Sequence, residues 1–115
     1  MLSLSHPAVH RYKADKNRIK INVDEDFSAL RKKSWRWQEF SELIKTREGR
    51  LFLLRAIPSR VKTIMADMCY ELEIIESITF QHHSLIVQKR KNSTWEDAFK
   101  IINKVFDKRD ISPKI

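Results

Sequence analysis

The chain of 115 residues contains a single glycine, Gly49, although glycine usually makes up about 7% of a protein. Glycine supplies the left-handed backbone of many tight hairpin turns, so its scarcity limits how many such turns can form. We therefore predict a helix-dominated α+β fold in a single domain, with an all-α fold as the alternative. Hydrophobic residues make up 42% of the chain, which is a globular composition.

The first regular element that the sequence predicts is a short strand. Residues 1–17 show no clear periodicity and are predicted to form a flexible arm or a loop. In residues 18–23, apolar and polar side chains alternate, with Ile19 and Ile21 on one face and Lys20 on the other. This alternation is typical of a half-buried strand.

Three helices are predicted from apolar residues at helical spacing. The first spans residues 27–45 and ends before Gly49, and the second spans residues 59–76. The last begins at Ser93, because Ser93 and Glu96 have the spacing of a capping box. Two of these helices are long, so the prediction gives helix the larger share of the fold.

Two segments are ambiguous. Residues 51–54 are apolar but too few to assign, and a buried connector is favoured over contact with a membrane surface because Pro58 ends the run. Residues 77–91 favour a small hairpin, because β-branched and aromatic residues lie on both sides of His82 and His83. A helix is the alternative for this second segment.

Positive charge is concentrated in the first half of the chain. Residues 1–62 hold fifteen Lys or Arg against seven Asp or Glu, whereas residues 63–115 hold eight of each. The net charge is +8. A directed positive field of this kind favours a polyanionic partner.

Cations and tryptophans occur together in residues 31–37. In the predicted helix, Trp35 and Trp37 are separated by about 200° around the axis, so they cannot share one face. Trp37 falls on the predicted core face, which leaves Trp35 exposed among cations, where it would stack on an unpaired base. The predicted nucleic-acid-binding residues are Arg31, Lys32, Trp35, Arg36, Lys89, Arg90 and Lys91. Lys16, Arg18 and Lys20 would extend the basic surface.

Two structural alternatives stay open for these residues. Trp35 would pack under the N-terminal arm or act as the hot spot of a protein interface. Residues 89–91 would form a separate, solvated strand end unless the fold brings them beside residues 31–36. The structure of residues 77–91 decides whether the two basic clusters meet.

The sequence carries no motif of a reaction, a metal site or a cofactor. Cys69 lies in an apolar stretch and is predicted to belong to the core, and His82 and His83 are predicted to be a surface pair. The acids of the second predicted helix do not share one face, so they are interpreted as a surface that repels nucleic acid, docks a basic partner or pairs with the chain's own arginines. They are Asp67, Glu71, Glu73 and Glu76. We predict no catalytic residue, no metal ligand and no cofactor.

The leading functional hypothesis is a small basic protein that binds nucleic acid, RNA or single strands in preference, as a ribonucleoprotein component or regulator. The alternative is an adaptor or inhibitor of the phage or mobile-element type that binds an acidic partner protein through its basic face and Trp35. A third hypothesis is a toxin-like ribonuclease that uses a histidine or Tyr70. The single cysteine and the lack of a long apolar run predict a cytoplasmic, reducing location without a membrane partner, with mitochondria as the alternative.

Overall fold

The computed structural model of the chain describes residues 1–30, 33–69 and 74–115, apart from the side chains of Trp37 and Cys69. The described elements are, in chain order, β1 (Val9–Arg11), β2 (Arg18–Asn22), β3 (Ser34–Arg36), α1 (Trp37–Lys45), α2 (Arg47–Ala56), α3 (Ser59–Cys69), β4 (Ile75–Gln81), β5 (Ser84–Lys89) and α4 (Trp95–Arg109). Helices and strands alternate irregularly along the chain, so the arrangement of the strands has to be established from their pairing.

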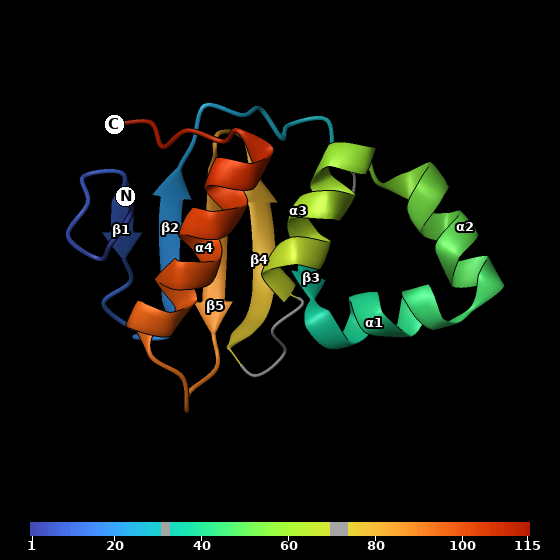
Figure 1. The fold of residues 1–115 in the computed structure, drawn as a ribbon, viewed down its shortest axis with the longest axis horizontal. Helices are drawn as coiled ribbons and strands as arrows, with labels where there is room; N and C mark the ends of the chain where they lie inside the picture. Colours follow the sequence, from blue (N-terminus) through green and yellow to red (C-terminus); the bar gives the residue numbers. More distant parts are fainter. Residues whose placement is uncertain (31–32, 70–73) are drawn as a thin grey trace.

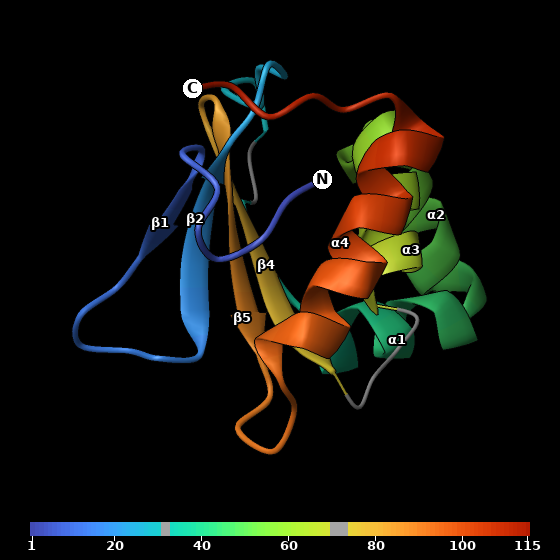
Figure 2. The same cartoon turned by 60° about the vertical axis from the view of Figure 1, so that its left-hand side comes forward.

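In the described part of the chain, five strands form one antiparallel sheet in the order β1-β2-β5-β4-β3. Helices α3 and α4 pack side by side on one face of this sheet (Figure 1). The opposite face, which we call the open face, is not covered by any of the described helices (Figure 2). An antiparallel sheet with one packed face and one solvated face is a common arrangement.

The expectation of a helix-dominated fold is wrong, because a five-stranded sheet is the centre of this α+β structure. The β4–β5 hairpin forms without glycine. Its turn consists of His82 and His83, and neither residue has a positive φ. Turns with negative φ at both central positions accept most residue types, so the scarcity of glycine does not limit this hairpin.

The helix predicted for residues 27–45 is also wrong over its first half. Residues 34–36 form β3 on the edge of the sheet, and α1 begins only at Trp37. Phe27 lies in an irregular segment, where its backbone N–H donates to the carbonyl of His82 at 2.8 Å and its ring meets Phe80 edge-on at 4.9 Å. These tertiary contacts outweigh the helical spacing of the apolar residues.

The core lies between the sheet and α3 and α4. Its strands contribute residues that alternate along β2, β4 and β5 and point toward the helices, as strand geometry requires. They are Ile19, Ile21, Ile78, Phe80, Leu85 and Val87, each with at most 1% of its surface exposed. From the helices, Met65, Met68, Phe99, Ile102 and Phe106 pack against them. The predicted strand at residues 18–23 is thus confirmed as β2.

Helix α4 begins one residue later than the capping-box spacing predicts. Thr94 is the N-cap, and its hydroxyl accepts from the backbone N–H of Asp97 at 3.2 Å. Ser93 instead donates from its hydroxyl to the carbonyls of Ile74 and Arg90, which holds the turn after β5 against the start of β4. Asp110 ends the helix in the left-handed conformation, with φ of 57°.

An ion pair joins α3 to α4. Arg109 donates to one carboxylate oxygen of Asp67 at 2.6 and 2.8 Å, and the ammonium of Lys108 lies 3.6 Å from the other oxygen. The interpretation that acids of this segment pair with the chain's own arginines is therefore confirmed for Asp67. The described part of α3 spans Ser59–Cys69, and β4 begins at Ile75, so the predicted helical end at residue 76 is wrong; residues 71 and 73 lie outside the described part of the chain.

Helices α1 and α2 extend beyond the β3 edge of the sheet (Figure 1). Gly49 does not follow a helix, as predicted, but lies inside α2, where it is buried against the backbone of Leu43 in α1. Residues 51–54 belong to α2, and only Leu53 of the four is buried, so the expected buried connector is wrong. Within the described residues, no helix combines the length and the hydropathy that a membrane crossing requires.

Candidate functional site

Two rows of paired residues cross the open face of the sheet. Residues directly opposite one another in an antiparallel pair project from the same face, so the register places each row. The first row contains His10, Lys20, Ile86, Thr79 and Ser34. The second row contains Arg18, Gln88, Ser77 and Arg36. The ionisable side chains of both rows are therefore three cations and a histidine.

Hydrogen bonds fix the polar side chains of these rows. Arg18 donates to the side-chain oxygen of Gln88 at 3.2 Å, and the hydroxyl of Ser77 donates to the same oxygen at 3.2 Å. The hydroxyls of Ser34 and Thr79 lie 3.0 Å apart across the β3–β4 pair. The open face is thus an ordered polar surface, with cations on β2 and β3 and neutral side chains between them.

One end of the open face is hollowed beside the His82–His83 turn. The hollow has a volume of about 430 Å³ and is lined by Lys20, Asn22, Lys33, Gln81, His82, His83 and Ser84. All of its charged or titratable lining residues are lysines and histidines, and amide and hydroxyl groups supply further donors. This donor set suits an oxyanion such as a phosphate.

One carboxylate lies close to this turn. The pKa of Asp26 is lowered, chiefly because the side chain of Ser28 donates a hydrogen bond to the carboxylate and secondly because its backbone N–H does so at 2.9 Å. Attraction to His83 and His82 is a smaller cause of the same shift. Asp26 is therefore a fixed negative charge next to the hollow, and it is not one of the hollow's lining residues.

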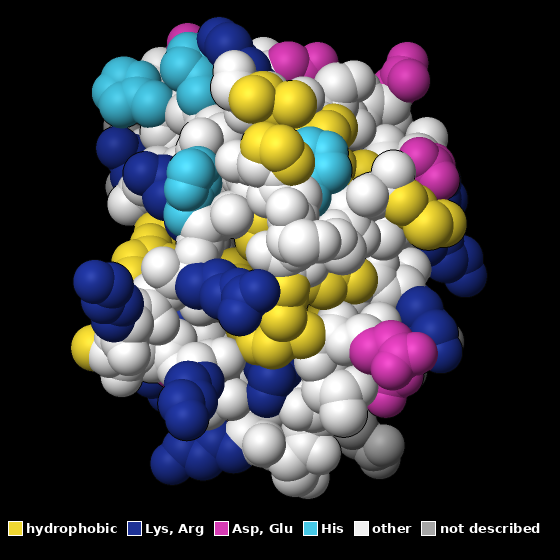
Figure 3. Space-filling model, turned by 90° about the vertical axis from the view of Figure 1, so that its left-hand side faces the viewer, with side chains coloured by type: hydrophobic (Ala, Val, Ile, Leu, Met, Phe, Trp, Pro, Cys, Tyr) yellow, Lys and Arg dark blue, Asp and Glu magenta, His cyan; other side chains and the backbone are white. Residues whose placement is uncertain are grey.

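The charges of one side of the molecule can be seen from the β1 edge. Figure 3 shows histidines at the upper left and several Lys and Arg side chains along the left and at the bottom. Most Asp and Glu side chains of that view lie at the top and on the right. Lys and Arg side chains also occur on the right of this view, so its left side is mainly cationic and its right side carries both charges.

The structure contradicts the predicted exposure of Trp35. Only 1% of its surface is exposed, because β3 turns Trp35 toward the helices, opposite Ile78 of β4. Trp35 therefore offers no face to a base or to a partner protein in this structure. Its neighbour Arg36 is exposed on the open face, and Arg31 and Lys32 lie outside the described residues.

The second predicted cluster is divided by the structure. Lys89 is only 7% exposed, and its ammonium donates to the side-chain oxygen of Asn17 at 2.8 Å and lies 5.7 Å from the Trp95 ring. Its ammonium is thus engaged within the fold. Arg90 is half-buried and Lys91 is exposed in the turn after β5. The hairpin places this turn at the same end of the sheet as Arg36, and two strand spacings, about 10 Å, separate β5 from β3.

Sequence reasoning found part of the open face and missed the rest. Arg18 lies on the solvent side of β2, and Lys20 is half-buried there, as expected. Lys33 and the hollow beside the His82–His83 turn were missed. The polar residues on each side of Trp35, Ser34 and Arg36, form a strand pattern once Trp35 is taken as buried, so the sequence could have indicated β3, which directly follows Lys33.

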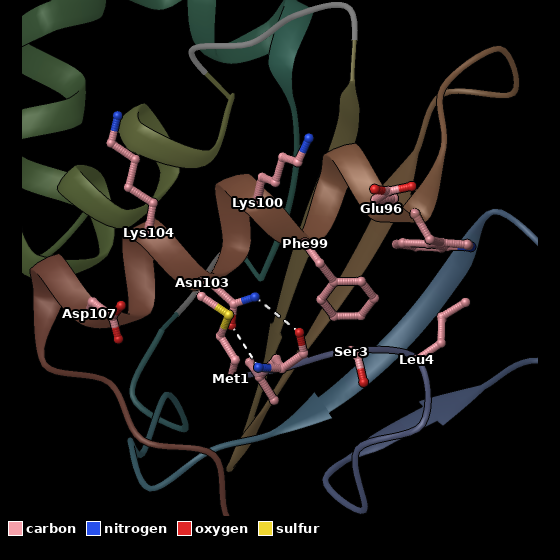
Figure 4. Close-up of a pocket in the computed structure, with 11 residues that line it drawn as sticks. Met1, Ser3, Leu4, Glu96, Phe99, Lys100, Asn103, Lys104 and Asp107 are labelled. Atoms are coloured by element: carbon pink, nitrogen blue, oxygen red, sulfur yellow. Dashed lines mark hydrogen bonds between the residues drawn. The ribbon is translucent and has the colours of Figure 1, made fainter.

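A second, more apolar hollow lies between the N-terminal segment and α4 (Figure 4). Its volume is about 710 Å³, and Leu4, Trp95 and Phe99 supply much of its apolar lining. The amide of Asn103 accepts from the backbone N–H of Leu2 at 2.7 Å and donates to the Leu2 carbonyl at 3.0 Å, as the dashed lines in Figure 4 show. The segment expected to be an arm is thus bound to α4 at Leu2 and contributes β1 to the sheet.

We expect Asn103→Ala to release the first residues of the chain from α4. Two hydrogen bonds to Leu2 would be lost, which lowers the free energy of unfolding by about 1 to 2 kcal/mol. Hydrogen exchange should show loss of protection at the Leu2 amide, and urea unfolding should measure the change in stability. Lys104→Ala, one residue along α4 and exposed, is the control that should leave both unchanged.

Comparison with known proteins supports the fold of the chain and indicates no function. A scan of protein-family models found no match, and a search of curated proteins found none either. Among solved structures, the crystal structure of protein SAV1430 from Staphylococcus aureus is similar, with a TM-score of 0.58 and 14% sequence identity. The similarity covers 87% of this chain and 95% of that one. At this identity the similarity shows a shared fold alone. Among the described residues, no group of three or more His, Cys, Asp or Glu is placed to hold a metal ion.

Proposed function

We propose that the chain binds nucleic acid through the open face of its sheet, with RNA or single strands preferred. The observation that carries this proposal is the arrangement of Lys20, Arg18 and Arg36 on both sides of a neutral polar centre. Three strand spacings, about 14 Å, separate β2 from β3. A phosphate backbone laid across this face would contact cations on both strands, and contacts of this kind supply most non-specific affinity.

Because Trp35 is buried, the proposed binding does not include stacking of a base on this side chain. The two rows of the open face contain no Trp, Tyr or Phe, so base stacking on an aromatic platform has no residue there to carry it. Half-buried Ile86 and the side chains of Thr79 and Gln88 are the groups that would meet bases. We therefore propose binding dominated by phosphate contacts, with little base selectivity and strong dependence on salt.

The preference for a single strand follows from the shape of the face. A duplex groove is usually read by a helix or a ribbon that projects into it. In the described part of the chain, no helix projects from the open face (Figure 2). An exposed sheet face instead favours an extended, unpaired strand, which is how sheet-based RNA-binding domains bind RNA.

Fluorescence anisotropy with labelled single-stranded RNA and duplex DNA of equal length tests the proposal. Between about 50 and about 200 mM salt, three to four phosphate contacts should weaken binding to the single strand by roughly 20- to 50-fold. For the single-stranded RNA, the double variant Lys20→Gln, Arg36→Gln should reduce the slope of log affinity against log salt by about 1.4, because two phosphate contacts are lost. The variant removes side chains from the open face and leaves the core unchanged.

A variant of equal net charge provides the control. Lys100→Gln, Lys104→Gln removes two exposed lysines from α4, on the other side of the sheet, and should leave the slope unchanged. Equal effects of both double variants would mean that only the total charge matters and would refute an open-face site. No binding to either nucleic acid at 50 mM salt would refute the proposal altogether.

The same experiment separates binding from cleavage. The proposal assigns no catalytic step to the chain, so the RNA should be recovered intact after incubation. Cleavage that is lost on replacement of His82 or His83, both exposed in the β4–β5 turn, would favour the ribonuclease hypothesis instead.

A further inference from the structure

Exposed apolar side chains are concentrated on the two helices that extend beyond the β3 edge. Apart from the two terminal residues, the large hydrophobic residues of the described chain that are well exposed all lie in α1 or α2. They are Ile44, Leu51, Phe52 and Leu54, with exposures of 40, 43, 47 and 65%. We call the last three the α2 patch. Clustered exposed hydrophobic residues mark interaction sites more often than scattered ones do.

Arginines are interleaved with the α2 patch. At 100° per residue, Arg47 and Arg55 project between Leu54 and Phe52 around the helix axis, on either side of Leu51. The N-cap Thr46 begins this helix, and Arg50 donates to the carbonyl of Ile44 at 3.1 Å, which ties α2 to α1. The exposed side of α2 therefore combines apolar anchors with an excess of positive charge over its single acid, which is Glu48.

A groove runs along the C-terminal end of α2. Its volume is about 970 Å³, and its lining includes Leu30, Phe52, Leu54, Arg55, Ile57 and Pro58. Leu30 comes from the segment before β3, and Pro58 from the connection to α3. The groove is thus formed by three segments and presents apolar walls with a guanidinium among them, which suits a side chain that projects from a partner.

We propose that the α2 patch and this groove bind an amphipathic helix of a partner protein that carries carboxylates beside its apolar residues. Apolar anchors would enter the groove beside Phe52 and Leu54, and carboxylates would pair with Arg47 and Arg55. Helix-in-groove recognition of this kind uses apolar residues at i, i+3 or i+4, and i+7. Charge complementarity selects the acidic partner.

Two other occupants fit the surface less well. A second copy of the chain would bring its own α2 arginines against those of the first, which repel. An anionic lipid surface would bind a helix with one continuous apolar face, whereas here Arg47 and Arg55 interrupt that face. The α2 patch lies beyond the β3 edge of the sheet, so it is separate from the open face and from the nucleic-acid proposal (Figure 1).

Selection from a random library of helical 16-residue peptides against the full chain tests the proposal. We expect the enriched peptides to carry net negative charge and apolar residues at helical spacing. The double variant Phe52→Ser, Leu54→Ser should weaken their binding at least tenfold, and Arg47→Glu, Arg55→Glu should do the same. Both pairs are exposed, so the variants should keep the circular dichroism and the thermal midpoint of the parent chain.

Controls keep the outcomes distinct. Ile115→Ser removes an exposed hydrophobic residue at the other end of the chain and should not affect peptide binding. RNA binding by the Phe52→Ser, Leu54→Ser variant should equal that of the parent, so failure of one proposal leaves the other standing. Enrichment of neutral or basic peptides would overturn the inference. So would enrichment of peptides that bind both double variants as tightly as they bind the parent chain. So would self-association through α2 in sedimentation, or binding to phosphatidylglycerol vesicles without any peptide enrichment.

Discussion

Replacement of Trp35 by alanine should lower the free energy of unfolding by about 3 to 5 kcal/mol, the range for truncating a large buried aromatic side chain. Trp35 is among the largest fully buried side chains and pairs with Ile78 across the β3–β4 ladder. Because a domain of this size is stable by about 5 to 15 kcal/mol in total, the variant should be marginally folded at best. Urea unfolding followed by circular dichroism measures the change.

Two observations would distinguish this result from a surface role of Trp35. Trp35→Phe keeps most of the apolar volume and should cost less than the alanine variant, while leaving RNA affinity unchanged. An exposed stacking residue would show the opposite pattern, with stability preserved and affinity for single strands lost in both variants. A loss of stability below about 1 kcal/mol for Trp35→Ala would contradict the burial of this side chain.

Gly49→Ala should destabilise the contact between α1 and α2, although alanine is the better helix former. Intrinsic propensity alone predicts stabilisation by about 0.8 to 1 kcal/mol. The added Cβ, however, would overlap backbone atoms of Leu43, including its carbonyl oxygen, and backbone cannot rotate away as a side chain does. We expect a net loss of about 1 to 3 kcal/mol, together with faster hydrogen exchange along α2.

Ala56→Gly provides a comparison at the exposed last residue of the same helix, where it should cost less than about 1 kcal/mol, because the full propensity penalty of glycine applies in a helix interior. If Gly49→Ala stabilised the chain instead, α1 and α2 would not approach as closely as the structure shows. Because Gly49 has no positive φ, the sign of the effect tests the close approach alone. Gly49→Ala should also weaken the binding of a ligand to the α2 patch.

Elements with a strong local pattern could be predicted from the sequence. The alternation in residues 18–23 identified β2, the residues around the His82–His83 turn identified the β4–β5 hairpin, and α4 was predicted to within a residue of its start. The three-residue strands β1 and β3 could not be found in this way. Each is too short to carry a period of its own and exists because a neighbouring strand pairs with it.

The candidate site was predicted less well because it depended on those short strands. A helix over residues 27–45 would separate Trp35 from the core, whereas β3 turns it inward and leaves Arg36 on the open face. For Lys89 the sequence did contain the answer: it follows Leu85 and Val87 at strand spacing, so it shares their buried face. The open face itself required the sheet order, which no local pattern encodes.

The strand order also sets when the open face can exist during synthesis. The two strands that join β2 to β3, β5 and β4, are the last two in the chain. A nascent chain that ends at Ile74 can pair β1 with β2, but it lacks β5, which pairs with β2, and β4, which pairs with the residues of β3. The cations of β2 and β3 are therefore brought onto one surface only after the β4–β5 hairpin has been made and paired, so polyanion binding at this surface would report that the hairpin has joined the two parts of the sheet.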